Sequence, residues 1–474
     1  MTTLDDLLAA PPRSGKRPRG DNPLAQLALS PLAVLFAAAT AVRNRPSILI
    51  VAGIVVVCLP ANISNLTGDG RITVADLVAG LLVAVLTIRL IGGDRTISRR
   101  GWLPFAAALS SFALATVIAS DVLVSAVGFI RYAEIFVLVP VAVAMSLRDR
   151  LDVLLVAGAI IAVTVFEGAF GVYQYLTGTG ASYGGDFVRA VGTFGAEQIM
   201  ALAALLGYGL VITLALALAT HSRPRAGLFA VSGFLVLALG FTLSRGAWIA
   251  TVVAVLVLLF VAHWRLAAFL CAMAALGVAI LLWSAGGTSA DPSSGRLDQR
   301  LLSITSVSSS PDQSVRDRYA LWAAARGIWA DHPVVGVGMK DFVAYRDSYS
   351  SVELSAGSDV GDPTSGVTRQ ALMSPHNQYL MVLSEQGAVG ILAFGGLLVT
   401  MAAGAVRRTR PRTLPATEER FLDLAAPALM VWTLIDWMYG DIGAGPSTVL
   451  MATLLGIVVR RGVIVPRPPD GETA

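Results

Sequence analysis

One histidine stands where a proton could be transferred at a membrane boundary. His376 belongs to SPHNQYLMVLSEQGAVG (Ser374 to Gly390), where a long polar segment returns to an apolar one. Ser374 is typical of an N-cap and Pro375 of a first helical position, which predicts His376 in the first turn of a helix. The positive end of the helix dipole disfavours a protonated imidazole, so His376 should be neutral and able to accept a proton. The alternative is a histidine that only lies at the water interface.

Arginines that could bind an anion lie near the same predicted boundary. Arg131 lies in an apolar stretch, Arg189 in the Gly-rich FVRAVGTFGAEQ, and Arg245 in TLSRGAW. Guanidinium groups bind phosphate oxygens bidentately, so several of them around one cavity would form a diphosphate site without a metal. The alternatives are pairing of Arg131 with Glu134 three residues on, and snorkelling of Arg189 and Arg245 to the membrane surface.

The polar segment before His376, residues 286–375, contains one stretch with helical character, Ser314 to Pro333. Arg318 supplies charge there, and the apolar side of the predicted helix carries Leu321, Trp322, Ala325, Ile328 and Trp329. Tryptophans on such a helix suit a membrane interface. The flanking segments 286–313 and 343–373 are rich in Ser, Gly and Asp and are expected to be mobile.

Three acids near the histidine, Glu385, Asp436 and Asp441, are better explained by structural pairing or helix–helix hydrogen bonds than by catalysis. The sequence contains no P-loop, no GxGxxG that opens a βαβ unit and no clustered acidic pair. Its two cysteines both lie in apolar stretches. We therefore expect no cofactor, no metal site, no disulfide framework and no nucleic-acid partner.

The elements that would position these residues are membrane-spanning helices. Of the 474 residues 55% are hydrophobic and 14% charged, against about a quarter charged in soluble proteins. Only helices and closed barrels satisfy the backbone in lipid, and these apolar runs do not alternate as barrel strands would. The fold class is therefore all-α and polytopic, with about twelve spans, predicted at 46–61, 72–91, 102–120, 124–147, 151–176, 196–220, 226–243, 246–263, 266–285, 376–404, 419–439 and 445–460.

The basic residues predict how these spans are oriented. An N-terminus inside places 23 of the 35 basic residues on the inner side, so both termini are expected to be cytoplasmic and the long loop outside. The predicted order is a disordered tail at 1–23, an interfacial or re-entrant helix at 24–45, nine spans in 46–285, an extracytoplasmic loop with an amphipathic helix at 286–375, three spans in 376–461, and a cytoplasmic tail at 462–474.

Four sequence pieces, in this order and spacing, resemble the O-antigen ligase / O-antigen polymerase superfamily of envelope glycosyltransferases. They are RAVGTFG (Arg189 to Gly195), LSRGAW (Leu243 to Trp248), RYALWAAARGIWADHPVVGVG (Arg318 to Gly338) and PHNQYLMVLSEQGAVG (Pro375 to Gly390). The resemblance covers roughly residues 120–410. It departs from the family at AEQ (Ala196 to Gln198), where relatives often carry an asparagine and a proline.

The resemblance implies transfer of a glycan from an undecaprenyl-diphosphate carrier to an acceptor hydroxyl at the outer face of the bacterial cytoplasmic membrane. It implies no nucleotide sugar and no metal. By position, Arg245 and Arg318 would hold the diphosphate with help from Arg189, and His376 would act as general base. Arg131, Asn377 and Tyr379 complete the residues expected to contact the substrate.

The acceptor class stays open at this point, because the superfamily contains ligases to lipid, ligases to protein and polymerases that extend a glycan. A transporter or flippase of an anionic lipid-linked substrate is the alternative from another class. Transporters often carry inverted repeats, and the two halves of this sequence show no repeated pair of motifs. A structural subunit of an envelope assembly would leave the outer arginines unexplained.

Overall fold

The computed structural model describes residues 39–66, 72–91, 99–183, 188–198, 200–221, 223–285, 313–351, 354, 358–362, 366–370, 372–407, 414–442 and 447–464. The chain divides into two compact units, Met1–Asn44 and Arg45–Ala474. In the first unit only residues 39–44 are described, and they are helical. The predicted tail at 1–23 and most of the predicted interfacial helix at 24–45 therefore lie outside the described residues.

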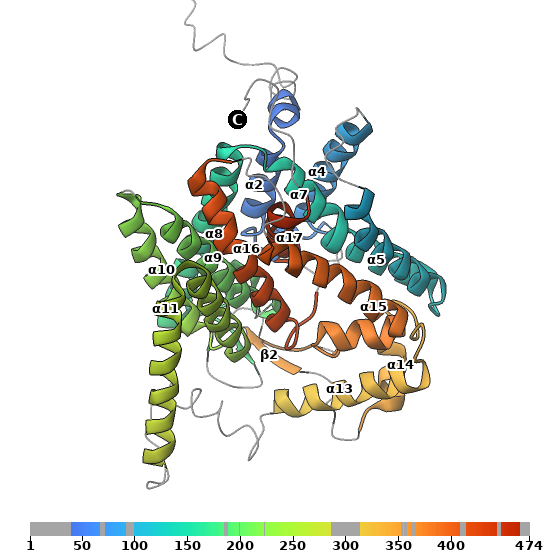
Figure 1. Cartoon of the computed structure of the whole chain (residues 1–474). Helices are drawn as coiled ribbons and strands as arrows, with labels where there is room; N and C mark the ends of the chain where they lie inside the picture. Colours follow the sequence, from blue (N-terminus) through green and yellow to red (C-terminus); the bar gives the residue numbers. More distant parts are fainter. Residues whose placement is uncertain are drawn as a thin grey trace, which may run out of the picture. The chain divides into compact units, whose positions relative to one another are not determined.

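The second unit consists mainly of helices (Figure 1). Those before the long loop are α2 (Ser47–Val56), α3 (Ala61–Ser64), α4 (Val74–Ile91), α5 (Arg99–Val117), α6 (Val122–Ala133), the π-helix η2 (Glu134–Leu138), α7 (Val139–Ser146), α8 (Arg150–Thr177), the 3₁₀ turns η3 (Gly192–Phe194) and η4 (Ala196–Gln198), α9 (Ala201–Ala219), α10 (Pro224–Phe241) and α11 (Arg245–Ala285). Those in the loop and after it are α13 (Gln313–Asp331), α14 (Phe342–Tyr349), α15 (Gln378–Val406), α16 (Ala416–Asp436) and α17 (Ser447–Gly462).

Seven helical stretches in the described part of the chain are long and apolar enough to cross a membrane. They are Val74–Ile91, Val122–Ser146, Arg150–Thr177, Ala201–Ala219, Pro224–Phe241, Arg245–Met273 and Gln378–Val406. This confirms a helical polytopic membrane protein. Every predicted span overlaps a helix, and the two predicted at 246–263 and 266–285 both fall in α11, which is interrupted at His263 (φ −151°, ψ 77°). The number of twelve crossings stays a prediction.

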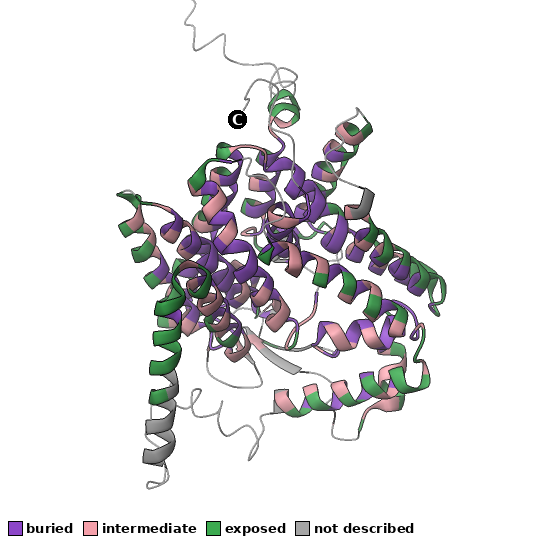
Figure 2. Ribbon diagram, in the orientation of Figure 1, coloured by how far each residue is buried: buried purple, intermediate pink, exposed green. Residues whose placement is uncertain are grey.

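The helix α9 is the most buried of these seven stretches. It packs against α8, α10, α11 and α16, and its small residues allow close approach: a Cβ on Gly207 would lie 2.6 Å from Trp432 Nε1. Tyr208 of α9 also lies with its ring 4.1 Å from that of Trp432. Figure 2 shows buried residues gathered around α9 and exposed ones along the outer sides of α10 and α11. Large apolar side chains such as Leu237 and Val252 are exposed there, as expected of faces that meet lipid.

Ion pairs join the connections that the sequence predicts on the inner side. Arg45 pairs with Asp149 and Asp152 at 2.8 and 2.6 Å, and Asp149 forms a capping box at the start of α8. Similar pairs join Arg150 to Glu418 at 3.0 Å and Arg461 to Asp423 at 2.6 Å. The connections predicted on the outer side contact one another through the sheet and hydrogen bonds described below. The inner-side connections and the outer-side connections therefore form two separate groups. Which set faces the cytoplasm stays a prediction.

A small antiparallel sheet ties the long loop to the connection between α8 and α9. Its order is β1 (Ser182–Tyr183), β2 (Ser358–Asp362) and β3 (Gly366–Gln370), with Ser182 opposite Gly361 and Ser358 opposite Gln370. The segment 343–373 was predicted to be mobile because of its Ser, Gly and Asp content. Its described residues have more regular structure than the sequence suggested, since most of α14 and both strands β2 and β3 lie within it.

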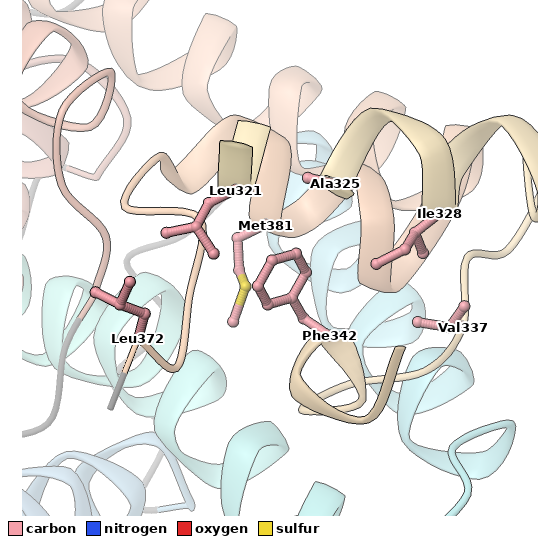
Figure 3. Close-up of a cluster of buried hydrophobic side chains, with 7 residues drawn as sticks. All are labelled: Leu321, Ala325, Ile328, Val337, Phe342, Leu372 and Met381. Carbon is pink, nitrogen blue, oxygen red and sulfur yellow. The ribbon is translucent and has the colours of Figure 1, made fainter. Parts of the chain in front are cut away.

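The predicted helix of the loop is α13, and its apolar side is buried against the protein's own chain (Figure 3). Leu321, Ala325 and Ile328 are fully buried in one hydrophobic cluster with Val337, Phe342, Leu372 and Met381. The expectation that this apolar side meets the membrane is therefore wrong for these three residues. The reason is that the chain reverses after α13, so that α14 and the start of α15 cover it, and Figure 1 shows α13 beside both.

The motif after α13 fits into a break in α15. Gly387 has φ 62° and ψ −157°, which interrupts the helix, and the freed backbone groups are bonded by the segment Pro333–Gly338. Ala388 and Val389 donate to the carbonyls of Pro333 and Val334 at 2.9 and 3.0 Å, while Val337 and Gly338 donate to Ser384 and Glu385 at 3.1 and 2.9 Å. The loop and the predicted tenth span are thus one folded unit.

The residues directly after this segment are bonded to the end of α5, the start of α6 and the turn between them. Met339 N donates to the Ala115 carbonyl at 2.9 Å, and Ser125 Oγ donates to the Met339 carbonyl at 2.5 Å. Asp341 accepts from Ser120 N and Oγ at 2.6 and 2.8 Å. The loop is therefore held between α5, α6 and α15, which fixes the elements that carry the candidate site.

Candidate active site

His376 lies immediately before α15, in a strained backbone conformation. Its φ is 47°, in the left-handed region that few residues other than glycine adopt, although histidine does so more readily than most. Asn377 is the N-cap, and its side-chain oxygen accepts from Leu380 N at 3.0 Å. The predicted N-cap at Ser374 is therefore wrong: its Oγ accepts from His376 N at 3.2 Å and closes a short turn instead.

The residues that follow His376 are bonded to the turn after α16. Gln378 N donates to the carbonyls of Trp437 and Gly440 at 2.9 and 3.0 Å, and Asn377 Nδ2 donates to Met438 O at 3.1 Å. The Gln378 side chain accepts from Ile442 N at 3.1 Å and donates to Tyr132 Oη at 2.9 Å. These bonds fix the two residues after His376 against the segment 437–442.

Residues before His376 are bonded to α13. Trp322 Nε1 donates to the carbonyl of Pro375 at 2.9 Å. This tryptophan was expected at a membrane interface, yet its indole nitrogen binds the segment that carries the histidine. The loop helix thereby sets the position of His376 and brings Arg318, one turn earlier on α13, close to it.

Charges of both signs act on the imidazole. Burial lowers the pKa of His376 below its ordinary value, the Asp441 carboxylate opposes this shift, and the Arg318 guanidinium adds to it. A lowered pKa favours the neutral imidazole that the sequence predicts, but its cause is burial rather than a helix dipole. A neutral imidazole beside a carboxylate can accept a proton and be stabilised once it is charged.

Asp436 is the last residue of α16 and Asp441 lies in the turn after it. Arg318 acts electrostatically on Asp436 as it does on His376. Asp441 Oδ2 is buried and has no hydrogen-bond partner among the described residues. The structure therefore gathers His376, Arg318, Asp436 and Asp441 into one charged group. The sequence predicts a structural role for both aspartates. Their position on either side of Gly440, where an apolar run ends, is the sequence feature that could have indicated a role in the site.

Arg245 is the first residue of α11 and lies beside the same turn. Its neighbour Gly246 faces Tyr439, whose Cβ would lie 3.5 Å from a Cβ added at Gly246. Leu243, two residues before Arg245, also has a positive φ of 52° in the tight reversal between α10 and α11. The structure thus brings the LSRGAW motif to the segment 437–442, which also contacts Asn377 and Gln378.

Arg189 lies in an irregular segment next to that reversal. Its backbone pairs with Ala181 in both directions, at 2.8 and 3.1 Å, and Ala190 N donates to the carbonyl of Phe241 at 3.2 Å. The residue is 9% exposed. Arg189 and Arg245 therefore lie on two adjoining connections, one before α9 and one before α11.

Arg131 has carboxylate partners. Its guanidinium hydrogen-bonds Asp76 of α4 and lies 3.5 Å from Glu134, three residues on. The local pairing that we raised as the alternative is thus present, together with a second partner that the sequence did not suggest. Two carboxylates close to Arg131 compete with a phosphate for its charge.

A cavity of about 830 Å³ opens beside the histidine, between α13, the start of α15 and the end of α16. It is lined by Tyr319, Trp322, Arg326, Asn377, Tyr379, Leu380, Leu434, Ile435 and Met438. Asn377 and Tyr379, both expected to contact substrate, therefore face one cavity. Their polar atoms also bond the protein, since Tyr379 Oη donates to Leu434 O at 2.7 Å.

Glu385 lies away from the histidine, at the docked loop segment, which is compatible with the structural role predicted from the sequence. It is buried, and its Oε1 accepts from Phe342 N at 3.3 Å. Among the residues that the structure describes, no group of three or more His, Cys, Asp or Glu side chains is placed to hold a metal ion.

These features define the class of protein: a polytopic helical membrane protein whose long loop folds onto one end of its helices and encloses a histidine among charged groups. Residues 230–395, about a third of the chain, match a family model described as O-antigen ligase. This match supports the resemblance seen in the sequence to the O-antigen ligase / O-antigen polymerase superfamily. The match contains Arg245, Arg318 and His376, whereas Arg131 and Arg189 precede it. A search of curated proteins finds no match.

Proposed function

We propose that the protein transfers a glycan from an undecaprenyl-diphosphate carrier to an acceptor hydroxyl at the outer face of the cytoplasmic membrane, with His376 as general base. Arg318 and Arg245 hold the diphosphate, and Arg189 assists them. Neither a metal ion nor a nucleotide sugar takes part. Arg131 is left with a mainly structural role, because Asp76 and Glu134 already neutralise its charge.

The reaction is one displacement at the anomeric carbon. The acceptor hydroxyl oxygen attacks that carbon while its proton passes to the His376 imidazole. The bond from the anomeric carbon to the diphosphate oxygen breaks, and undecaprenyl diphosphate leaves with the electron pair, which the guanidinium groups stabilise. One direct displacement inverts the configuration of the carbon. The Asp441 carboxylate stabilises the imidazolium that forms.

One observation carries this proposal: the half-buried imidazole of His376 feels the charges of a cation, Arg318, and a carboxylate, Asp441, and the next residue, Asn377, lines an open cavity. A base, a cation for the leaving group and room for a substrate are what the displacement needs. The family match over residues 230–395 supports the same assignment and contains both His376 and Arg318.

The test is transfer by purified protein from an undecaprenyl-diphosphate oligosaccharide, with chelator present. Wild type is compared with His376→Ala, Arg318→Ala and the matched control Arg316→Ala, an exposed arginine on the same helix. We expect loss of about 10²–10⁴-fold for His376→Ala, as for removal of a general base, and no loss for Arg316→Ala. Full activity in His376→Ala and Arg318→Ala would refute the site.

The products separate the reactions that the family allows. Longer glycan chains on the carrier indicate a polymerase, and glycan on a separate lipid or protein indicates a ligase. Movement of intact carrier across proteoliposome membranes, without any new glycosidic bond, would instead show the transporter that the sequence left as an alternative.

A further inference from the structure

The irregular segment that carries Arg189 is held by polar side chains of α8. Residues 188–198 connect α8 to α9, and Figure 1 shows these two helices side by side. Backbone that is not helical leaves N–H and C=O groups unpaired by its own segment, and in a membrane protein such backbone needs partners from the protein. Two residues of α8, Glu167 and Gln174, supply them.

Gln174 bonds the turn at Val191 and Gly192 on both sides. Its Oε1 accepts from Val191 N at 3.1 Å and Gly192 N at 2.8 Å, and its Nε2 donates to Gly192 O at 3.0 Å. The side chain is 8% exposed. One amide group therefore satisfies three backbone groups, which a shorter or apolar side chain could not do.

Glu167 lies seven residues earlier, hence two turns away on the same face of α8. Its two oxygens accept from Thr193 N at 2.9 Å and Thr193 Oγ1 at 2.6 Å, and the residue is fully buried. A Cβ at Gly192 would lie 2.3 Å from Glu167 Oε2, and Gly192 has φ 67°. The glycine of RAVGTFG is thus needed both for its backbone conformation and for the approach of this carboxyl group.

Between the two polar residues Gly171 makes room for the segment. A Cβ added there would lie 3.2 Å from the Cβ of Ala190, the residue next to Arg189. One face of α8, formed by Glu167, Gly171 and Gln174, therefore receives residues 190–193. None of these three residues of α8 takes part in the proposed displacement.

We infer that Glu167 and Gln174 are positioning residues for Arg189. They hold residues 191–193 and so place the preceding guanidinium at the diphosphate end of the site. Arg189 is 9% exposed and comes two residues before Val191, so its backbone position depends on how residues 191–193 are held. This inference rests on the proposed function, in which Arg189 assists Arg245 and Arg318 in binding the diphosphate.

The experiment is a double-mutant cycle in donor KM and kcat, with Arg189→Ala, Glu167→Ala and the double variant. A residue that acts through Arg189 has no further effect once Arg189 is gone. We expect each single variant to raise the donor KM about tenfold, and the double variant to match Arg189→Ala within about twofold. Additive losses, or an effect on kcat alone, would overturn the inference.

Two further variants separate positioning from folding. Glu167→Gln keeps an acceptor for Thr193 N and an amide group that the Thr193 hydroxyl can turn to meet, so it should restore the donor KM. Thr164→Val is the matched control, because Thr164 is equally buried on α8 and its hydroxyl donates to the Ile160 carbonyl of its own helix at 2.6 Å. It should leave KM unchanged.

If Glu167→Ala does not fold, Gln174→Ala takes its place in the cycle, since it removes three bonds to the same segment. The outcomes also separate this inference from the proposed function. Full transfer by His376→Ala refutes the function. Loss of transfer in His376→Ala, together with unchanged KM in Arg189→Ala, leaves the function standing and refutes the positioning role.

Discussion

At the scale of single residues, the position of His376 and its protonation have different causes. The left-handed φ of 47° is maintained by bonds on both sides, from Trp322 to Pro375 O and from Gln378 N to the turn after α16. Burial lowers the pKa of the imidazole, the Asp441 carboxylate opposes this shift and the Arg318 guanidinium adds to it. A strained residue that its surroundings hold this firmly is typical of a functional site. Backbone strain and charge can therefore be tested by separate substitutions.

The pH dependence of transfer tests the charges around His376. Its pKa is lowered, so the base stays neutral to more acidic pH, and activity should fall only as pH drops below the ordinary histidine range. Arg318→Gln removes a cation that lowers this pKa, so the acid limb of kcat/KM should move to higher pH. Asp441→Asn removes a carboxylate that raises it, so the limb should move to lower pH. Shifts in the same direction for both variants would contradict the assignment, and Arg316→Gln should cause none.

The backbone of His376 can be tested apart from its chemistry. Asparagine tolerates the left-handed conformation but cannot serve as a base near neutral pH. A β-branched valine cannot serve as a base either, and it also disfavours the left-handed conformation. His376→Asn should lower transfer by about 10²–10⁴-fold and leave thermal unfolding in detergent almost unchanged. His376→Val should in addition cost about 1–3 kcal/mol of unfolding free energy. Equal stability of the two variants would mean that the positive φ carries no strain.

At the scale of elements, helices could be predicted and breaks in them could not. Apolar runs placed every span on a helix, and the spacing of Leu321, Ala325 and Ile328 identified α13. Periodicity could not show that Gly387 interrupts α15, because the residues around it remain apolar and only the docking of Pro333–Gly338 satisfies the freed backbone. The N-cap was misplaced for a related reason: Ser374 and Asn377 are both good caps, and the turn after α16 selects Asn377.

The site divides in the same way. His376, Arg318 and Arg245 could be chosen from sequence because their types and their motifs point to the chemistry. Asp441 and the carboxylate partner of Arg131 on α4 could not, because each comes close to its partner only through packing between distant helices. Sequence spacing reports neighbours on one helix and is silent about neighbours on another.

Glycines at the break in α15 provide a prediction at this scale. A Cβ at Gly336 would lie 2.4 Å from the backbone carbon of Glu385, and Gly336 has φ 69°. Gly336→Ala should therefore cost more than the about 1–2 kcal/mol of a left-handed alanine and lower transfer as the loop undocks. Gly396→Ala, on α15 itself, is the control, with no atom within 4 Å of the added carbon, and should be neutral or slightly stabilising. The measurements are thermal unfolding and transfer activity of both variants. Equal losses in Gly336→Ala and Gly396→Ala would contradict the docking of Pro333–Gly338 on α15.

At the scale of the whole molecule, the proposed reaction requires the site to be on the side where the carrier presents its glycan. The long loop, the histidine and the Arg189 and Arg245 connections are joined at one end of the helices, and the ion pairs of Arg45, Arg150 and Arg461 at the other. The positive-inside rule predicts that the second end is cytoplasmic. The proposed reaction needs the histidine on the outer side, and the distribution of basic residues places the opposite end inside, so both predict the same orientation.

Cysteine labelling in right-side-out spheroplasts tests that orientation. In a background with Cys58→Ala and Cys271→Ser, Ser348→Cys on α14 and Ala416→Cys at the start of α16 each place one thiol at an exposed position. A membrane-impermeant maleimide should label Ser348→Cys in intact spheroplasts and Ala416→Cys only after permeabilisation. Transfer activity of both variants is the control for correct folding, because neither residue lies in the proposed site. The reverse labelling pattern would place the histidine in the cytoplasm, away from the carrier-linked glycan, and the proposed function would fall with it.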